Sequence, residues 1–236
     1  MSQVLAAPLF YIFFIYGLSF IVLSVVLFRE IGKASKIAMV STFSILAVFG
    51  MLHGLAEWTD WVRFILDGGN LPVFAAAGPG AGEPWFLKYV SQILMVVSFT
   101  VLFQFAVNML TYKSENKSAR AIPAVLFILY LIYIFASGTV AQSVFAAGNI
   151  GRHLFGFVGG TMAAIALLKL ANELMPLGNS RLISGLAAGA LGFAYYSVFG
   201  GLILHPVIGL PVQLFRMCCA IEIAFSSFYI LDVFKA

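Results

Sequence analysis

Charged residues are scarce in this sequence: Lys, Arg, Asp and Glu together make up 9% of its 236 residues, against about 25% in soluble domains. Hydrophobic residues make up 62%, which is more apolar surface than one soluble core could bury. We therefore expect an integral membrane protein in contact with the lipid bilayer. The net charge of +4 comes from basic residues in short loops, so it predicts membrane topology and no nucleic-acid partner.

Several motifs of known chemistry are missing. The two cysteines, Cys218 and Cys219, are adjacent, so a disulfide is not expected. No C-x-x-C-H motif predicts covalent haem, and no Gly-rich phosphate loop or nucleophile elbow predicts an enzyme. The last apolar run has no deep lysine for a retinal Schiff base. The N-terminal run lacks a basic flank and is long, which favours a retained helix over a cleaved signal peptide.

Apolar runs of membrane-spanning length predict an all-α fold, a single-domain polytopic bundle of seven transmembrane helices in residues 1–236. A helix needs roughly 20 apolar residues to cross the hydrocarbon. The seven predicted spans are 7–28, 36–58, 85–112, 121–139, 152–173, 181–204 and 211–234.

The basic residues orient this bundle through the positive-inside rule. Nine of the 13 would lie on one side of the membrane: Arg29, Lys33, Lys36, Lys113, Lys117, Arg120, Lys169, Arg181 and Lys235. The N-terminus is then predicted outside and the C-terminus in the cytoplasm of a bacterial inner membrane. All three tryptophans, Trp58, Trp61 and Trp85, fall at the outer interface.

Two local patterns predict further features. Residues 58–67, "WTDWVRFILD", alternate apolar and charged side chains, which predicts a short helix lying on the outer surface. The fifth span carries small residues at four-residue spacing, which favours close helix packing: Gly156, Gly159, Gly160, Ala163 and Ala164.

Polar residues gather at the predicted outer boundary. All three histidines, His53, His153 and His205, map there, together with Arg152 and Arg216. Glu57 is four residues from His53 and shares its helix face, so its carboxylate could orient the imidazole. Gly54 would leave room beside that ring. We expect the guanidinium of Arg216 to bind Glu57 or Asp60, as the fork of arginine suits a carboxylate.

These residues permit several kinds of site. Three imidazoles could bind a transition metal, through His53, His153 and His205; two could ligate a haem b iron; and a quinone would need a His or Tyr donor beside an apolar channel. Each histidine could equally be a polar helix end that reaches water. Glu222 lies deeper in the last span and is a functional candidate as an intramembrane acid, with Tyr195, Tyr196 and Ser226 as candidate partners.

Three stretches together carry a resemblance to a known family: "FGMLHGLAEWTDW" (49–61), "GRHLFGFVGGTMAAIALL" (151–168) and "GLPVQLFRMCCAIEIAFSSFYILDVF" (209–234). They resemble the membrane-embedded N-terminal input region of certain bacterial sensor histidine kinases and diguanylate cyclases, and the resemblance covers most spans in order. It implies a shared outer-side constellation: His53, Gly54, Glu57, Trp58, Arg152, Gly156, Pro211, Gln213 and Arg216.

Two differences from that family shape the expectation. The relatives continue from the last span into a cytoplasmic output domain, whereas this sequence ends at Ala236, so we expect a free-standing input region or an output domain on another chain. The family is expected to carry an aromatic residue where this chain has His153. A bis-histidine haem would then be special to this protein.

The sequence therefore predicts a non-enzymatic membrane sensor or ligand-binding module. It would bind a small ligand, redox cofactor or metal at its outer side and signal through the last helix to a cytoplasmic kinase or cyclase protein. The alternative is an electron-transfer subunit, cytochrome b-like or quinone-reactive, that joins other respiratory-chain subunits, and a third interpretation is a structural subunit with no ligand. A homodimer is compatible with both functions.

Overall fold

The structure, a computed structural model, describes residues 3–31, 38–66, 85–114, 117–207 and 210–231. Within these ranges the chain is helical and forms no β-strand, which confirms the all-α prediction. The main helices are α1 (Gln3–Ile31), α2 (Ala38–Leu66), α3 (Trp85–Leu110), α4 (Ile122–Ala136), α6 (Val144–Gly151), α7 (Val158–Leu174), α8 (Ser180–Tyr196) and α9 (Val212–Ile230).

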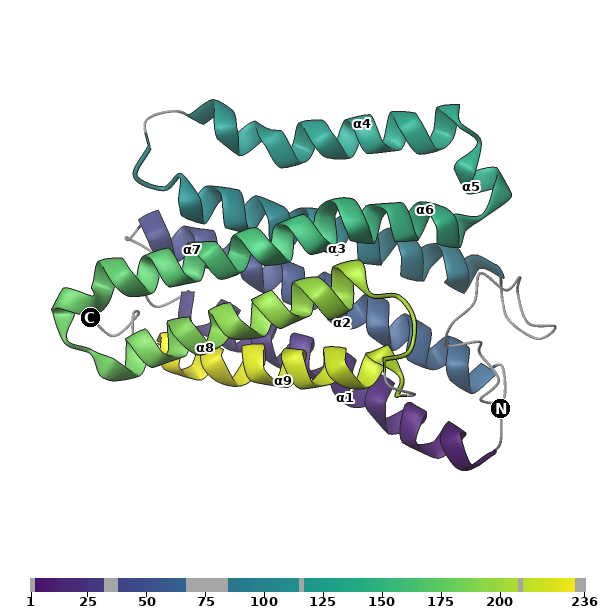
Figure 1. The fold of residues 1–236 in the computed structure, drawn as a ribbon, viewed down its shortest axis with the longest axis horizontal. Helices are drawn as coiled ribbons and strands as arrows, with labels where there is room; N and C mark the ends of the chain where they lie inside the picture. The colour runs from purple at the N-terminus through teal and green to yellow at the C-terminus, as the bar shows by residue number, and fades with distance from the viewer. Residues whose placement is uncertain (1–2, 32–37, 67–84, 115–116, 208–209, 232–236) are drawn as a thin grey trace.

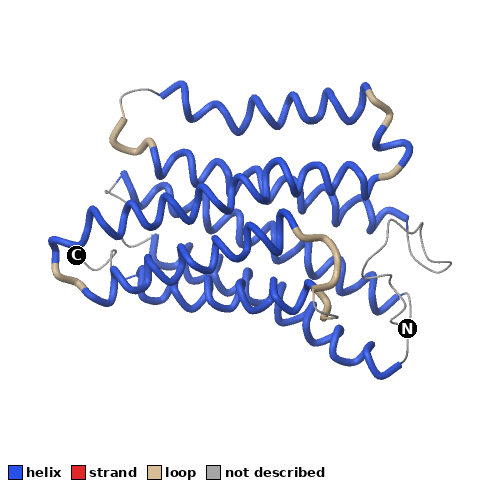
Figure 2. Tube along the Cα trace, in the orientation of Figure 1, coloured by secondary structure: helices blue, strands red, loops and turns tan. Residues whose placement is uncertain are grey.

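Short helical segments join or extend these helices: η1 (Lys117–Ala121), α5 (Thr139–Gln142), η2 (Arg152–Phe157), η3 (Met175–Leu177) and η4 (Ser197–Leu202). Both η2 and η4 are π-helical. The long helices run antiparallel along the chain, so α1 begins at one end of the bundle and α9 finishes at the other (Figure 1). Tight turns connect several of them, as the trace in Figure 2 shows.

Six helical segments in the described part of the chain are long and apolar enough to cross a membrane: Pro8–Ile31, Phe86–Leu110, Ser118–Ala136, Val144–Leu177, Ser180–Leu202 and Val212–Ile230. The molecule thus has the make-up of a multi-pass membrane protein. α2 is 29 residues long but is not among the six. Its second half carries His53, Glu57, Asp60 and Arg63, which lower its hydropathy. The seven-span count therefore stays a prediction.

Two predicted boundaries differ from the structure. Residues 58–66 are not a separate surface helix, because α2 continues unbroken to Leu66. No glycine or proline interrupts the helix there. The indole of Trp58 also donates to the Phe14 carbonyl at 3.2 Å, which holds this part of α2 against α1. Residue 67 lies outside the described residues. The segment 140–151, which lies between the fourth and fifth predicted spans, is mostly helical. The Ser143 side chain caps α6 there by accepting from Ala146 N.

Glycines allow close contact between α1 and α2. A Cβ added to Gly17 would lie 2.3 Å from the Trp58 ring, and one added to Gly50 would lie 2.8 Å from the Phe20 carbonyl. A Cβ at Gly54 would lie 2.8 Å from the Gly17 carbonyl. Gly54 therefore brings the two backbones together, and its role beside the imidazole stays a prediction.

The small residues of the fifth predicted span pack as expected. A Cβ on Gly159 would lie 3.0 Å from the backbone of Phe103 on α3, and one on Gly160 would lie 2.8 Å from Cβ of Ser197 in η4. A Cβ on Gly201 would lie 2.2 Å from the Phe157 nitrogen. The two π-helical segments, η2 and η4, therefore meet backbone to backbone in the middle of the bundle.

Candidate functional site

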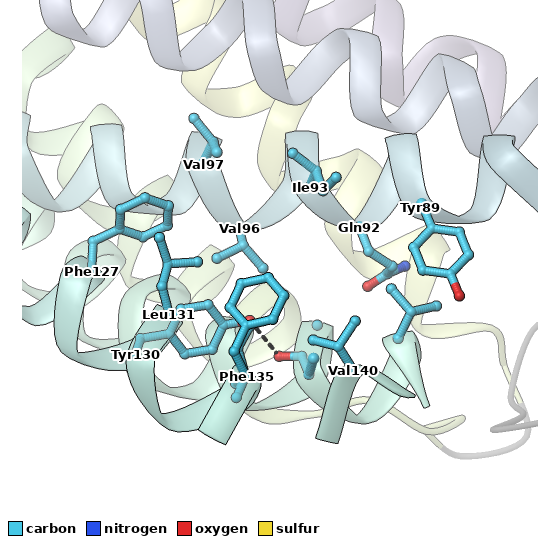
Figure 3. Close-up of a pocket in the computed structure, with 14 residues that line it drawn as sticks. Tyr89, Gln92, Ile93, Val96, Val97, Phe127, Tyr130, Leu131, Phe135 and Val140 are labelled. Carbon is cyan, nitrogen blue, oxygen red and sulfur yellow. Dashed lines mark hydrogen bonds between the residues drawn. The ribbon is translucent and has the colours of Figure 1, made fainter. Parts of the chain in front are cut away.

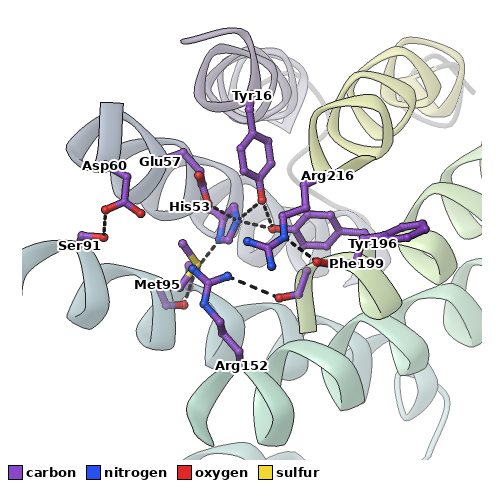
Figure 4. Close-up of polar contacts among 12 residues, drawn as sticks. Tyr16, His53, Glu57, Asp60, Ser91, Met95, Arg152, Tyr196, Phe199 and Arg216 are labelled. Atoms are coloured by element: carbon purple, nitrogen blue, oxygen red, sulfur yellow. Dashed lines mark hydrogen bonds and ion pairs between the residues drawn. The ribbon is translucent and has the colours of Figure 1, made fainter. Parts of the chain in front are cut away.

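His53 lies inside the bundle with none of its surface exposed. Its Nδ1 is 2.8 Å from the Ser98 hydroxyl of α3, and its Nε2 bonds to the Tyr196 hydroxyl of α8. The Tyr16 hydroxyl of α1 is 3.3 Å from the same nitrogen. The imidazole thus joins four helices, as Figure 4 shows.

The partners of Ser98 set the direction of these hydrogen bonds. Its hydroxyl donates to the Met95 carbonyl at 2.7 Å, so it accepts from Nδ1–H of His53, and Nε2 then accepts from the Tyr196 hydroxyl. The Tyr196 oxygen in turn accepts from Tyr16, whose hydroxyl is 2.8 Å away. Every donor in this series of hydrogen bonds has an acceptor. His53 is neutral in this arrangement.

Aromatic rings enclose the imidazole. The ring centroids of Phe20, Phe99 and Phe49 lie 4.7, 5.0 and 5.2 Å from that of His53. All three phenylalanines are fully buried. These rings keep water away from the imidazole, so each polar contact there is stronger than it would be in water.

Glu57 lies one helical turn beyond His53 on the same face, as its spacing predicts. Its Oε1 is 3.6 Å from His53 Nε2, and its side chain is buried. Oε1 has no hydrogen-bond partner in the described part of the chain. The Glu57 carboxyl group thus lies close to the imidazole without a hydrogen bond to it.

Arg216, near the start of α9, is buried and binds the end of the preceding helix. Its Nε donates to the Phe199 carbonyl at 2.5 Å and its Nη2 to the Ile203 carbonyl at 3.0 Å. The π-helical geometry of η4 makes this possible: Ile203 N bonds to the Val198 carbonyl at 2.7 Å, which leaves the Phe199 carbonyl for the guanidinium. The carbonyl end of a helix also favours a cation.

The predicted bond from Arg216 to Glu57 or Asp60 is therefore wrong: its guanidinium forms no ion pair within the described residues. Asp60 is occupied by Arg63 and Ser91, each 2.6 Å from its Oδ1. Glu57 and Arg216 still interact electrostatically through the core.

Arg152 approaches the cluster from η2. Its side chain is buried, and its Nη1 donates to the Gly200 carbonyl at 3.5 Å. The arginine side chain has five N–H donors, and this long contact is the one hydrogen bond that the Arg152 side chain makes among the described residues. Figure 4 shows its guanidinium pointing toward His53 from the side opposite Tyr16.

The fifth predicted span starts at residue 152, but the continuous helix begins at Val144 with α6. Arg152 therefore lies about 12 Å along this helix and not at its start.

The ionised groups of the cluster do not balance. Arg152 and Arg216 both act electrostatically on His53 and Glu57. With His53 neutral, two guanidinium charges face Glu57 alone, so the net charge of the cluster is at least +1. An uncompensated charge is costly inside an apolar bundle, so this site favours an additional anion.

The other two histidines do not join His53. The His153 side chain is exposed and its Nδ1 bonds to the Asn149 carbonyl of its own helix at 2.7 Å. His205 is exposed in the segment after η4. No group of three or more His, Cys, Asp or Glu side chains in the described residues is placed to hold a metal. The three histidines therefore do not converge on the predicted metal site, because helix rotation turns His153 outward. For the same reason no two of them are placed to hold a haem b.

Glu222 also lies apart from the cluster. It is half-buried on α9 and has no hydrogen bond or ion pair among the described residues. Of its candidate partners, Tyr195 is exposed, Tyr196 bonds to His53, and the Ser226 hydroxyl donates to the Ile223 carbonyl at 2.8 Å.

The sequence did not predict that three residues, Tyr16, Ser98 and Tyr196, would form hydrogen bonds around His53. Tyr16 and Ser98 lie in apolar runs with no motif around them, and Tyr196 was expected only near Glu222. The available signal was weak: a tyrosine in the middle of an apolar span needs a partner for its hydroxyl.

Comparison of the chain with protein-family models finds no match, and searches of curated proteins and of solved structures also return no match.

Proposed function

We propose that this protein is a membrane-embedded sensory module in which the His53 cluster receives the input and α9 carries the output. The cluster consists of Tyr16, His53, Glu57, Ser98, Arg152, Tyr196 and Arg216. The observation that carries the proposal is the position of Arg216: it lies on α9 and binds the π-helical end of α8, the helix whose Tyr196 bonds to His53. A change at the imidazole thus acts on α9 through contiguous contacts. The resemblance to kinase and cyclase input regions supports the same function.

The charge of the cluster favours a small ligand with an acidic group. Two guanidinium groups face Glu57 alone, and the Arg152 side chain has N–H donors beyond its single long hydrogen bond. A ligand carboxylate could accept from these donors and supply the missing negative charge. The Glu57 oxygen without a partner could accept a hydrogen bond from the same ligand.

Ligand chemistry can be tested by thermal unfolding of the purified protein in lipid nanodiscs. We expect short-chain carboxylates to raise the unfolding temperature of the wild type and their neutral amides to leave it unchanged. Arg152→Gln should abolish the carboxylate effect. Arg181→Gln is the matched control, because Arg181 is exposed at the start of α8, and should keep it. An equal response to amides, or a full response in Arg152→Gln, would contradict the proposed ligand class.

Coupling to α9 needs a structural readout. Spin labels at Tyr229→Cys on α9 and Ile132→Cys on α4, both exposed, in a protein without Cys218 and Cys219, report the distance between these helices. The carboxylate that stabilises the protein should shift that distance distribution, and His53→Ala should remove the shift. Stabilisation with no change at α9 would identify a binding protein without a sensory output.

A quinone-reactive electron-transfer site is the second candidate. The observation that favours it is the pair of tyrosine hydroxyls at His53 among three phenylalanine rings, since a quinone head accepts hydrogen bonds and stacks on aromatic groups. A short-chain quinone that stabilises the wild type but not Tyr16→Phe, with no response to carboxylates, would select this function. A haem absorption band would overturn both.

Membrane topology belongs to the proposal as well. We propose seven spans, with α2 as the seventh, and the positive-inside rule then predicts an outside N-terminus and a cytoplasmic C-terminus. Lys33, Lys36 and Lys235, which contribute to this orientation, lie outside the described residues. Reporter fusions at Lys117 and after Ala236 should both report the cytoplasm. Reporters on opposite sides would mean that one span is miscounted.

A further inference from the structure

A second site lies away from the His53 cluster, between α3 and α4. The structure has a pocket there of about 290 Å³, with walls from α3, α4, α5 and α6 (Figure 3). This volume is near the lower end of the range for small-molecule sites and could hold about ten groups the size of a water molecule. Its walls are almost entirely apolar, and Ile93, Val96 and Phe135 are typical members.

The position of α4 opens this pocket to the surroundings of the bundle. α4 stands apart from the other helices (Figure 1), and only Pro123, Tyr130 and Ile134 of its residues are buried. Its remaining surface exposes large apolar side chains, including Ile132 and Phe135. In a bilayer these side chains face lipid, so a molecule dissolved in the membrane can reach the pocket sideways between α3 and α4.

One polar group in this pocket has no partner. Gln92 of α3 is only 5% exposed, and its Oε1 forms no hydrogen bond within the described residues. Figure 3 shows its amide pointing from α3 into the pocket. Of the two tyrosines that line the pocket, Tyr130 is already used, because its hydroxyl donates to the Ala147 carbonyl at 2.8 Å. A buried amide oxygen without a donor is unfavourable in an apolar environment, so the pocket lacks one donor.

The helix opposite Gln92 is shaped around that amide. A Cβ added to Gly148 of α6 would lie 1.9 Å from Gln92 Oε1. Any side chain at this position would displace the amide, so Gly148 is what allows Gln92 to occupy its place at the rim of the pocket. The unpartnered oxygen is thus held by the packing of two helices.

We propose that this pocket binds an amphipathic molecule from the membrane, consisting of an alkyl chain and a head group that donates a hydrogen bond. The chain lies along the apolar wall between α3 and α4, and the head group, a hydroxyl or a protonated carboxyl, donates to Oε1 of Gln92. Lipid-soluble alcohols and fatty acids share this chemistry. The pocket is separate from the His53 cluster, so the inference is independent of the proposed sensory function.

Photolabelling can test this with a long-chain alcohol that carries a diazirine near the end of its chain. In wild-type protein in nanodiscs, we expect labels to concentrate on pocket residues such as Ile93 and Phe135. Excess 1-decanol should compete at least tenfold better than its methyl ether, which has the same chain but no donor. Decanoic acid, tested over a range of pH, shows whether a protonated carboxyl group can donate in place of the alcohol hydroxyl. Only its protonated form should compete.

Two variants and one control complete the test. Gln92→Leu keeps the bulk of the side chain but removes the amide, so alcohol and ether should compete equally; Gly148→Ala should have the same effect by displacing Gln92. Gln104→Leu on the same helix is the control, since Gln104 is satisfied by Asn108 and the Arg120 carbonyl, and should keep the preference. A preference that persists in Gln92→Leu would overturn the proposal, as would labels spread evenly onto exposed residues of other helices, such as Tyr229.

Discussion

The hydroxyl of Tyr196 on α8 hydrogen-bonds to Nε2 of His53 on α2, 143 residues earlier in the chain. Tyr196 is fully buried, whereas its neighbour Tyr195 is 51% exposed. The helix thus directs one tyrosine into the polar cluster and the next one away from it.

This pair of tyrosines provides a matched test of the cluster. Tyr196→Phe removes the donor to His53 and the acceptor for Tyr16, so we expect the free energy of unfolding to fall by about 1–3 kcal/mol. Tyr195→Phe should change it by less than about 0.5 kcal/mol. Titration with a denaturing detergent measures both, and equal losses would mean that the hydrogen-bonded chain does not stabilise the bundle.

Arg216 should not be replaceable by lysine. Its Nε and Nη2 bind the carbonyls of Phe199 and Ile203 simultaneously, and a single ammonium group cannot reproduce that fork. We expect Arg216→Lys to lower the free energy of unfolding by about 2 kcal/mol. Arg181→Lys, at an exposed position, is the control and should be near neutral. A neutral Arg216→Lys would show that the end of η4 is satisfied in another way.

The contact between the two π-helical segments should be intolerant of added volume. A Cβ at Gly201 would lie 2.2 Å from the Phe157 nitrogen, so the backbones of η2 and η4 would have to separate. We expect Gly201→Ala to cost about 1–3 kcal/mol in the same detergent titration. Ala187→Ser adds one atom to the exposed side of α8 and should cost little. Equal effects of the two changes would argue against the close contact.

Stability at alkaline pH should depend on Glu173. Its Oε2 accepts from Tyr112 at 2.5 Å and from Lys113 at 2.8 Å, both beyond the end of α3. Hydrogen bonding to Glu173 raises the pKa of Lys113 from its ordinary value of 10.5. Burial, together with the bond to Glu173, raises the pKa of Tyr112 from 10.0. Raised pKa values favour the protonated, folded form, so this contribution is complete below the ordinary values and declines as pH rises past them.

We therefore expect the unfolding temperature of the wild type to fall more steeply than that of Glu173→Gln between about pH 9 and about pH 11. Tyr133→Phe, which changes an exposed tyrosine of α4, should leave the slope of the wild type unaltered. Parallel curves for the wild type and Glu173→Gln would exclude a contribution from this contact.

Much of the fold followed from the sequence. Helices over most of the described parts of the predicted spans, the shared face of His53 and Glu57 and the small-residue packing of Gly159 and Gly160 all appear in the structure. These features depend on hydropathy and on the 3.6-residue period, which are properties of neighbouring residues. Helix ends were less predictable, since the cap at Ser143 and the continuation of α2 to Leu66 depend on local hydrogen bonds and on packing against α1.

The membership of the candidate site was decided by tertiary structure. The sequence placed three histidines and two arginines near one level, but only His53, Arg152 and Arg216 turn inward, because each helix's rotation is set by its neighbours. The partners of His53, Tyr16 and Tyr196, are 37 and 143 residues away from it, and no local pattern links them. The carbonyls that bind Arg216 become available only through the π-helical geometry of η4. Composition and periodicity thus determined that the chain forms a lipid-facing helical bundle, whereas helix rotation and backbone geometry determined which polar groups meet inside it.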